Sequence, residues 1–345
     1  MFRHLAAVTT ALAVVTVTPA EATPALVPAV DREVAFTADG TTAYGTLHVP
    51  EHRAGQRLRA ALLLPGSGPT DRDGNQPPAS LPDTLAQLAD TLGKDGVATL
   101  RFDKYGTGRT GLGTYQDRPE ELDYPAFVRQ ARAGYESLRD QPETDPHALL
   151  VRRTQRGCDG AMTGLLLGGT VRPRPAGLAL LQPQAIRMLD LVALQLRAQI
   201  AEATRQGQFT PEQQRTVNAA VDAAVTALRE RRPVDTADPP SPIARLFEAF
   251  QGPNARFVRS DDAVYPPDTA FALRPGTKVL LTWGTRDVQV PCDTTNALTT
   301  ALRHAHAHGP GRVVLPGVDH LMHDTDHPTT LAPPVLDSLH WLAQH

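Results

Sequence analysis

Two residues in the last quarter of the chain have the types and the spacing of a proton-transfer pair. Asp287 follows the apolar run Lys278 to Trp283, and His320 follows the run Arg312 to Leu315. Because the carboxyl ends of parallel strands meet at one edge of a sheet, we expect the two side chains to lie close together. A buried carboxylate fixes the tautomer of a neighbouring imidazole and stabilises its protonated form. The pair therefore predicts a general base that activates a nucleophile.

The nucleophile itself should lie on a tight turn between a buried strand and a helix. The stretch LLVRRTQRGCDGAMTGLLLGG, residues 149 to 169, has this form, but it contains no serine. Cys158 is the residue that stands at the turn before the helix beginning near Gly160.

Four motifs follow one another along the chain, and together they resemble a known family. They read LLLPGSGPTDRDGN, RFDKYGTGRTG, WGTRDVQVP and LPGVDH, and they cover most of the chain from about residue 30 to 345. The sequence resembles bacterial α/β-hydrolases of the serine esterase type, which are related to dienelactone hydrolases and serine aminopeptidases. The order nucleophile, acid, histidine is also that of this fold.

This resemblance implies a role for each candidate residue. Asp287 becomes the acid and His320 the base of a catalytic triad, with Cys158 in the nucleophile position. The backbone N–H of Ser67 becomes one oxyanion donor, and that of Asp159 the other. The implied substrate is a small-molecule carboxylic ester or related acyl compound, with no cofactor and no metal.

The turn around Cys158 departs from the family pattern Gly-His-Ser-Glu-Gly on its strand side. Arg156 stands where the turn needs glycine, and Val151 precedes Cys158 by about three residues more than usual. Synonymous codons for the residues from Arg153 to Cys158, read one nucleotide later, spell Gly-His-Ser-Glu-Gly. Three interpretations stay open: a local frameshift, a true cysteine nucleophile, or a relative that has lost its activity.

The elements that must position these residues are predicted from hydrophobic patterning. Buried strands alternate with helices, which predicts an α/β fold with a doubly wound, mostly parallel sheet. Strands are expected at residues 33–37, 42–49, 60–64, 97–102, 149–151, 176–181, 278–283 and 312–315, and helices at 81–92, 124–138, 160–167, 294–304 and 333–342. The alternation breaks where helices at 185–206, 211–231 and 243–250 predict a helical cap. We therefore expect a core over residues 30–183 and 268–345, with a cap insertion over 184–267.

The N-terminus has the pattern of a signal peptide over residues 1–22. A basic start precedes the apolar run from Leu5 to Val17, and Ala20-Glu21-Ala22 forms an A-x-A cleavage site. The run is too short for a comfortable membrane span. We expect a secreted or extracytoplasmic protein with no membrane span in the mature chain; an uncut anchor is the alternative.

Composition and the remaining motifs exclude some functions and leave others open. A net charge of −3 without a long basic run argues against nucleic acid as a partner. The loop from Gly106 to Gly111 fits G-x-G-x-x-G, but Pro119 follows soon after, and a dinucleotide fingerprint needs a helix at once. An oxidoreductase is thus a weak alternative, and an inactive relative that binds an acyl or apolar ligand is a stronger one. Oligomeric state and a bridge between Cys158 and Cys292 stay open.

Overall fold

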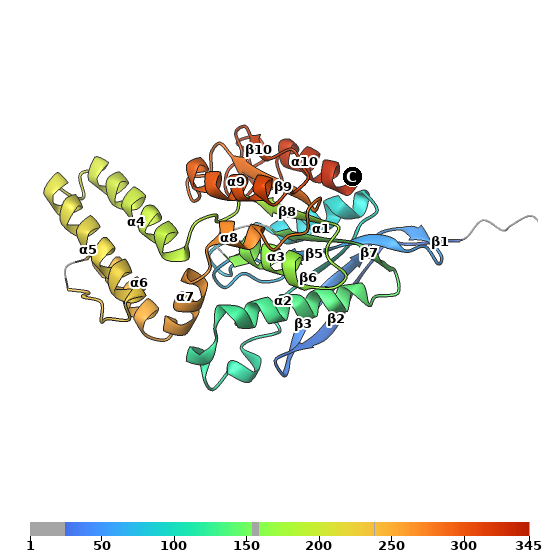
Figure 1. Ribbon diagram of the computed structural model, residues 1–345, viewed down its shortest axis with the longest axis horizontal. Coiled ribbons are helices and arrows are strands. Elements are labelled where there is room, and N and C mark those ends of the chain that lie inside the picture. Colours follow the sequence, from blue (N-terminus) through green and yellow to red (C-terminus); the bar gives the residue numbers. More distant parts are fainter. Residues whose placement is uncertain (1–24, 154–158, 238, 345) are drawn as a thin grey trace, which may run out of the picture.

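The computed structural model describes residues 25–153, 159–237 and 239–344. Its centre is an eight-stranded sheet in the order β2-β3-β6-β5-β7-β8-β9-β10 (Figure 1). The strands are β2 Val30–Ala38, β3 Thr41–Val49, β5 Leu58–Leu64, β6 Ala98–Phe102, β7 Thr144–Arg153, β8 Gly177–Leu181, β9 Lys278–Gly284 and β10 Arg312–Leu315, with a small separate pair formed by β1 Leu26–Val27 and β4 His52–Arg53.

The sheet is mostly parallel, as the sequence predicts. The strands from β6 through β5 to β10 pair in parallel, whereas β2 with β3, and β3 with β6, pair antiparallel. The β2–β3 hairpin turns at Asp39 and Gly40, whose φ angles are 47° and 75°. Two consecutive positive φ angles are typical of the two-residue turn that matches strand twist.

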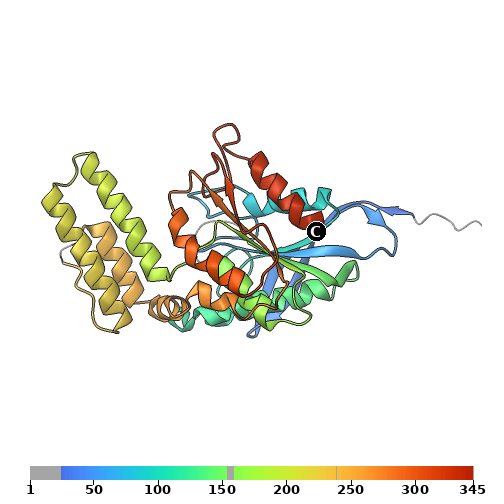
Figure 2. The same ribbon diagram turned by 45° about the horizontal axis from the view of Figure 1, so that its top comes forward.

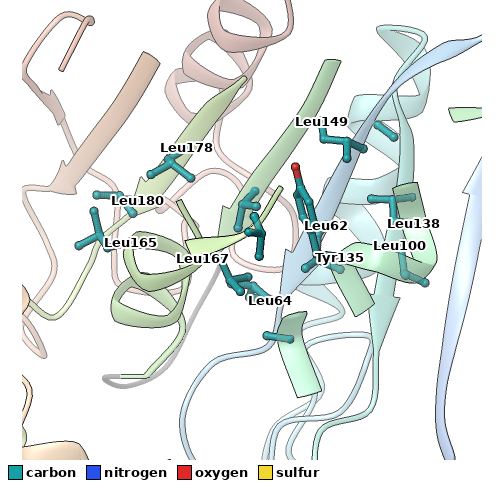
Figure 3. Close-up of a cluster of buried hydrophobic side chains, with 14 of the residues drawn as sticks. Leu62, Leu64, Leu100, Tyr135, Leu138, Leu149, Leu165, Leu167, Leu178 and Leu180 are labelled. Atoms are coloured by element: carbon teal, nitrogen blue, oxygen red, sulfur yellow. The ribbon is translucent and has the colours of Figure 1, made fainter. Parts of the chain in front are cut away.

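Helices cover both faces of the sheet, because successive side chains of its central strands point to opposite sides. The helices of the core are α1 Thr84–Lys94, α2 Tyr124–Arg139, α3 Asp159–Thr170, α8 Pro266–Ala270, α9 Asn296–His304 and α10 Pro333–Gln344. Leu62 and Leu64 join the cluster under α2, α3 and α9, whereas Ala61 and Leu63 join the cluster under α1 and α10. Figure 3 shows Leu62 and Leu64 beside Tyr135 in the first cluster. Each such leucine contributes about 1.5–3 kcal/mol by burial.

Helix α1 differs from the prediction at both ends. It begins at Thr84 rather than Leu81, because Asp83 takes a left-handed conformation with φ 49°. Asn75 holds Asp83 there by donating to its Oδ1 at 2.6 Å and accepting from its N–H at 2.8 Å. The helix also continues past Gly93, which is needed for packing rather than for termination: a Cβ there would lie 2.3 Å from Nε2 of His48.

The cap consists of α4 Met188–Arg205, α5 Pro211–Arg229, α6 Ser241–Gln251 and α7 Ala255–Asp262. These helices form a lobe with its own apolar core at one end of the molecule, and α4 and α5 extend away from the sheet (Figures 1 and 2). Asp262 joins three of the helices, because it accepts from the backbone N–H of Leu189 at 2.9 Å and from Nε of Arg229 at 2.9 Å. The sequence did not predict α7 or α8, and the expected boundary at residue 267 lies within α8.

Over the described ranges, none of the helices is both long enough and apolar enough to cross a membrane. The expected signal peptide, residues 1–22, lies outside the described residues.

Candidate active site

The loops after β9 and β10 bring Asp287 and His320 together. The two strands are parallel neighbours, and their loops are joined by bonds from the N–H of Thr285 to the carbonyl of Leu315 at 3.0 Å and from that of Arg286 to Val318 at 2.9 Å. Nδ1 of His320 lies 2.8 Å from Oδ2 of Asp287. Both side chains are buried, with exposed fractions of 4% and 0%.

The remaining atoms of this pair show how it is oriented. Oδ1 of Asp287 accepts the backbone N–H groups of Gln289 and Val290, each at 2.9 Å, so the carboxylate cannot rotate freely. Its other oxygen is left for His320, which assigns the proton of the neutral imidazole to Nδ1. Nε2 of His320 is buried and has no hydrogen-bond partner in the described part of the chain. This nitrogen is therefore the one that can accept a proton from a reacting group.

The loop that carries His320 is held by its neighbours. Oδ1 of Asp319 accepts the N–H groups of Leu321 and His323, at 2.8 and 2.9 Å. Gln182, at the end of β8, donates from its side chain to the carbonyl of Asp319 at 2.6 Å. Gln182 is not part of any of the four sequence motifs, although its place at the end of a predicted buried strand was a signal for it. Burial lowers the pKa of His323, a second histidine on the same loop.

Ser67 lies on the loop after β5, and three side chains hold this loop. Its carbonyl accepts from Oγ1 of Thr70 at 2.7 Å and from Nε2 of Gln76 at 2.9 Å. Nζ of Lys104 donates to the carbonyl of Gly66, the residue before it. Lys104 was also missed as a site residue, although it lies within the motif RFDKYGTGRTG.

Asp103 ties the Ser67 loop to the loop after β6. This buried carboxylate accepts the backbone N–H groups of Arg72 at 3.0 Å and Arg109 at 2.9 Å, and it pairs with the Arg72 guanidinium at 2.6 Å. Gly108 fits against it because a Cβ there would lie 2.2 Å from the carboxyl carbon. Asp103 therefore orders both loops rather than facing a ligand.

The glycine-rich loop from Gly106 to Gly111 closes on itself. The N–H of Gly106 donates to the carbonyl of Gly111 at 2.8 Å, and that of Gly111 donates to Thr107 at 3.0 Å. The next α-helix, α2, begins only at Tyr124. A pyrophosphate-binding loop needs the N-terminus of a helix directly after its glycines, so this loop does not have the dinucleotide-binding form.

The nucleophile turn is described only at its two ends. Strand β7 continues past Val151 to Arg153, which pairs with Leu64 on one side and Leu180 on the other. Helix α3 then begins at Asp159, so the backbone N–H of Asp159 lies at a helix N-terminus. Cys158 lies outside the described residues, as does any bridge from it to Cys292. The assignment of Cys158 therefore stays a prediction.

A cavity of about 520 Å³ opens beside Ser67, between the core and the cap. Ser67 and Lys104 line its core side, and the cap contributes Met188 and Val192. Four aromatic residues also line it, namely Tyr105, Phe127, Phe250 and Phe257. A mostly apolar cavity with a few polar groups is the usual form of a small-molecule site.

One hydrogen bond links the cap to the loop of the candidate acid. Nε2 of Gln195, on α4, donates to the carbonyl of Gln289 at 2.9 Å. Gln289 in turn donates its backbone N–H to Oδ1 of Asp287, so α4 contacts one of the residues that orient the buried carboxylate.

No group of three or more His, Cys, Asp or Glu side chains within the described ranges could hold a metal ion.

The strand order, the two antiparallel strands at one edge, and the acid and histidine after β9 and β10 define the α/β-hydrolase fold. No family model matches the sequence, and the search of curated proteins finds no match. Among solved structures, the α/β-hydrolase GrgF from Penicillium sp. sh18 is 17% identical over 84% of this chain and 91% of that one, with a TM-score of 0.51.

Two further solved structures show the same fold in proteins of different function. Est1E from Butyrivibrio proteoclasticus, solved with ferulic acid, is 17% identical over 90% of this chain and 98% of its own, with a TM-score of 0.52. The acylaminoacyl peptidase of Pyrococcus horikoshii is 11% identical over 92% of this chain and 41% of its own, with a TM-score of 0.57. Identities this low show a shared fold and not a shared activity, because one fold supports many activities.

Proposed function

We propose that the protein is a hydrolase of carboxylic ester or related acyl bonds, and that it works through a covalent acyl intermediate. The observation that carries this proposal is the buried pair in which Nδ1 of His320 lies 2.8 Å from Asp287 while Nε2 has no partner in the described chain. A histidine held in this way is a general base for a nucleophile placed at Nε2.

The proposed reaction uses the His320–Asp287 pair together with the N–H groups of Ser67 and Asp159, and Ser67 also lines the cavity. Nε2 of His320 takes the proton of the nucleophile, which attacks the acyl carbon, and Asp287 stabilises the imidazolium. The N–H groups of Ser67 and Asp159 stabilise the oxyanion of the tetrahedral intermediate. His320 then protonates the leaving alcohol, and a water activated by the same histidine releases the acid. Cys158 is the proposed nucleophile of the chain as it stands.

The shape and lining of the cavity support an apolar acyl or alkyl group as the part of the substrate that it encloses. The three phenylalanine rings and Met188 offer apolar surface, and the cavity volume of about 520 Å³ is in the usual range of small-molecule pockets. Esterases and peptidases share this fold, so an activity assay has to decide which class of acyl bond the protein cleaves.

The test compares His320→Ala with His304→Ala on a set of chromogenic esters. Both changes are made in whichever form hydrolyses esters, the parent or a variant with a restored serine turn, in which Gly-His-Ser-Glu replaces residues 153–159. His304 is an exposed histidine on α9, so its removal should leave hydrolysis unchanged. His320→Ala should abolish hydrolysis while the thermal midpoint stays close to that of the parent, because Asp287 keeps its two backbone donors. A His320→Ala protein with full activity contradicts the proposal.

A second candidate is a binding protein that has lost catalysis, which the departure of residues 152–158 from the family pattern favours. Such a protein would bind an apolar acyl compound in the same cavity without turnover. Fluorescent fatty-acid binding, with no hydrolysis of any ester by the parent or by a variant with a restored serine turn, would favour this candidate over the first.

A further inference from the structure

Lys104 is buried at the wall of the cavity, a position that the motif RFDKYGTGRTG does not explain. Only 7% of this lysine is exposed, yet it lines the cavity beside Ser67. Nζ donates to the carbonyl of Gly66 and lies 5.8 Å from the centre of the Phe127 ring. Burying an ammonium group costs free energy unless hydrogen bonds and charges compensate, so a buried lysine at a cavity wall calls for a specific role.

The acceptor of this hydrogen bond belongs to the peptide group that matters most for the proposed reaction. The carbonyl of Gly66 and the N–H of Ser67 are the two ends of one peptide unit. A hydrogen bond to the carbonyl of an amide polarises it and makes its N–H a stronger donor. The effect is larger when the donor is charged, as an ammonium group is.

The surrounding bonds hold both the lysine and the peptide in place. Gln130, fully buried on α2, accepts the N–H of Tyr105 at 3.1 Å and donates to the carbonyl of Asp103 at 3.2 Å. The backbone on each side of Lys104 is therefore fixed to α2. On the other side of the contact, Thr70 and Gln76 hold the carbonyl of Ser67, so the Gly66–Ser67 peptide has little freedom to turn.

We propose that Lys104 is a positioning residue that polarises and orients the Gly66–Ser67 peptide, and thereby strengthens the Ser67 N–H toward the developing oxyanion. This inference rests on the proposed function, because it takes Ser67 as an oxyanion donor. Lys104 acts through the peptide and need not touch the substrate. Its contribution should therefore grow as charge develops on the acyl oxygen, and it should be small in the ground state.

The polarisation can be measured without any catalysis. Gly66–Ser67 is the only Gly-Ser pair in the sequence, so labelling glycine at the carbonyl carbon with ¹³C and serine with ¹⁵N gives one coupled amide signal. In Lys104→Met, the Gly66 carbonyl carbon and the Ser67 amide proton should both shift upfield. Lys104→Arg keeps a charged donor and should retain most of the parent shift.

A matched control separates polarisation from loosening of the loop. Gln76→Met removes a bond to the carbonyl of Ser67, which belongs to the next peptide unit. It should leave the Gly66 carbonyl carbon close to its parent position. Equal upfield shifts of the Gly66 carbonyl carbon in Gln76→Met and Lys104→Met would mean that loop order alone sets this signal. An unchanged Gly66 carbonyl signal in Lys104→Met would mean that no polarisation occurs. Either result overturns the proposal.

Kinetics then test whether the polarisation serves the reaction. The measurement uses whichever form hydrolyses esters, the parent or a variant with a restored serine turn. In that form, Lys104→Met should lower kcat on the order of tenfold with little change in KM. This loss is smaller than the roughly 10²–10³-fold loss in kcat that follows removal of an entire oxyanion donor. Lys104→Arg should recover much of kcat.

If Lys104→Met does not fold, Lys104→Gln, which keeps a neutral donor, takes its place. An unchanged kcat, or a loss that falls on KM, overturns the catalytic part. Failure of every form to hydrolyse esters would refute the proposed function, and the carbonyl signal would still decide the polarisation.

Discussion

At the scale of single residues, the proximity of Asp287 and His320 could be predicted from sequence, whereas Cys158 as the nucleophile stays a prediction. Asp287 and His320 each follow an apolar run, and the parallel sheet brings such positions to one edge. The hydrogen bonds of Asp287 to two backbone N–H groups depend on the path of its loop, which no pattern in the sequence encodes. Lys104 and Gln182 were not among the predicted site residues, because the bonds that give them their roles go to backbone carbonyls distant in sequence.

The orientation of the carboxylate leads to a prediction for Asp287→Asn. Oδ1 would remain an acceptor for the N–H groups of Gln289 and Val290, so the amide NH₂ would face Nδ1 of His320 and impose the wrong tautomer. In an ester-hydrolysing form, kcat should fall by about 10⁴-fold with an almost unchanged fold. Steady-state kinetics and circular dichroism check both parts, and a loss below about tenfold would show that Asp287 does not orient His320.

At the scale of elements, apolar runs predicted the strands of the sheet. The predicted ends of helices were wrong where contacts between residues distant in sequence decide them. Asn75 sets the start of α1 through Asp83, and His48 explains why Gly93 lies inside that helix. Helices α7 and α8 are short, and α8 begins with two prolines, a residue type that is disfavoured inside helices. The sequence pattern gives the face that each element buries, but not the contacts at its ends.

The ion pair between Glu143 and Arg32 links the edge strand β2 to the start of β7. Two hydrogen bonds join the guanidinium to the carboxylate, at 2.7 and 2.8 Å, and both side chains are partly exposed. The side-chain hydrogen bond from Arg32 lowers the pKa of Glu143. A lowered pKa in the folded state gives stability that is fully present above the unfolded value of about 4.3 and is lost as the pH falls through the folded pKa.

Glu143→Gln should therefore lower the free energy of unfolding at pH 7 by no more than about 1 kcal/mol, because solvent screens a partly exposed pair. The difference from the parent should shrink as the pH falls from 5 toward the folded pKa. Urea titrations at several pH values measure it, with Glu120→Gln as a control at an exposed acid that has no ion pair in the described chain. A difference that stays constant over this pH range would mean that the charge of Glu143 is not the cause.

At the scale of the whole molecule, amphipathic helices predicted a cap, but the direction in which it extends was not predictable. Helices α4 and α5 satisfy each other's apolar faces within the lobe, so they need not lie flat over the sheet (Figure 2). Only part of the lobe reaches the cavity, through residues such as Met188 and Phe257. The sequence thus predicted the presence of the insertion, and packing within it decides its shape.

We propose that the protein is exported and that cleavage after Ala22 gives a mature chain beginning near Thr23. The basic start, the apolar run and the A-x-A site of the sequence support this proposal. Intact-mass analysis of protein recovered from the medium or the extracytoplasmic space should give the mass of the chain without its first 22 residues. Recovery of full-length protein that retains Met1 would refute it.

The central claim is that His320 and Asp287 form the proton-transfer half of a hydrolase whose nucleophile turn is impaired in this sequence. The most direct measurement compares ester hydrolysis by the parent with that of a variant in which Gly-His-Ser-Glu replaces residues 153–159 directly before Gly160. This change restores a serine and its oxyanion N–H together, and a misplacement of about 1 Å can cost on the order of a hundredfold in rate.

We expect the parent to be a very poor esterase and the repaired variant to be faster by several orders of magnitude, with all of the gain lost in the repaired variant that also carries His320→Ala. Ordinary enzyme rates in the parent, abolished by Cys158→Ala, would show that Cys158 is the nucleophile and that the turn is intact. A repaired variant that folds but stays inactive, or one that is active without His320, would contradict the account.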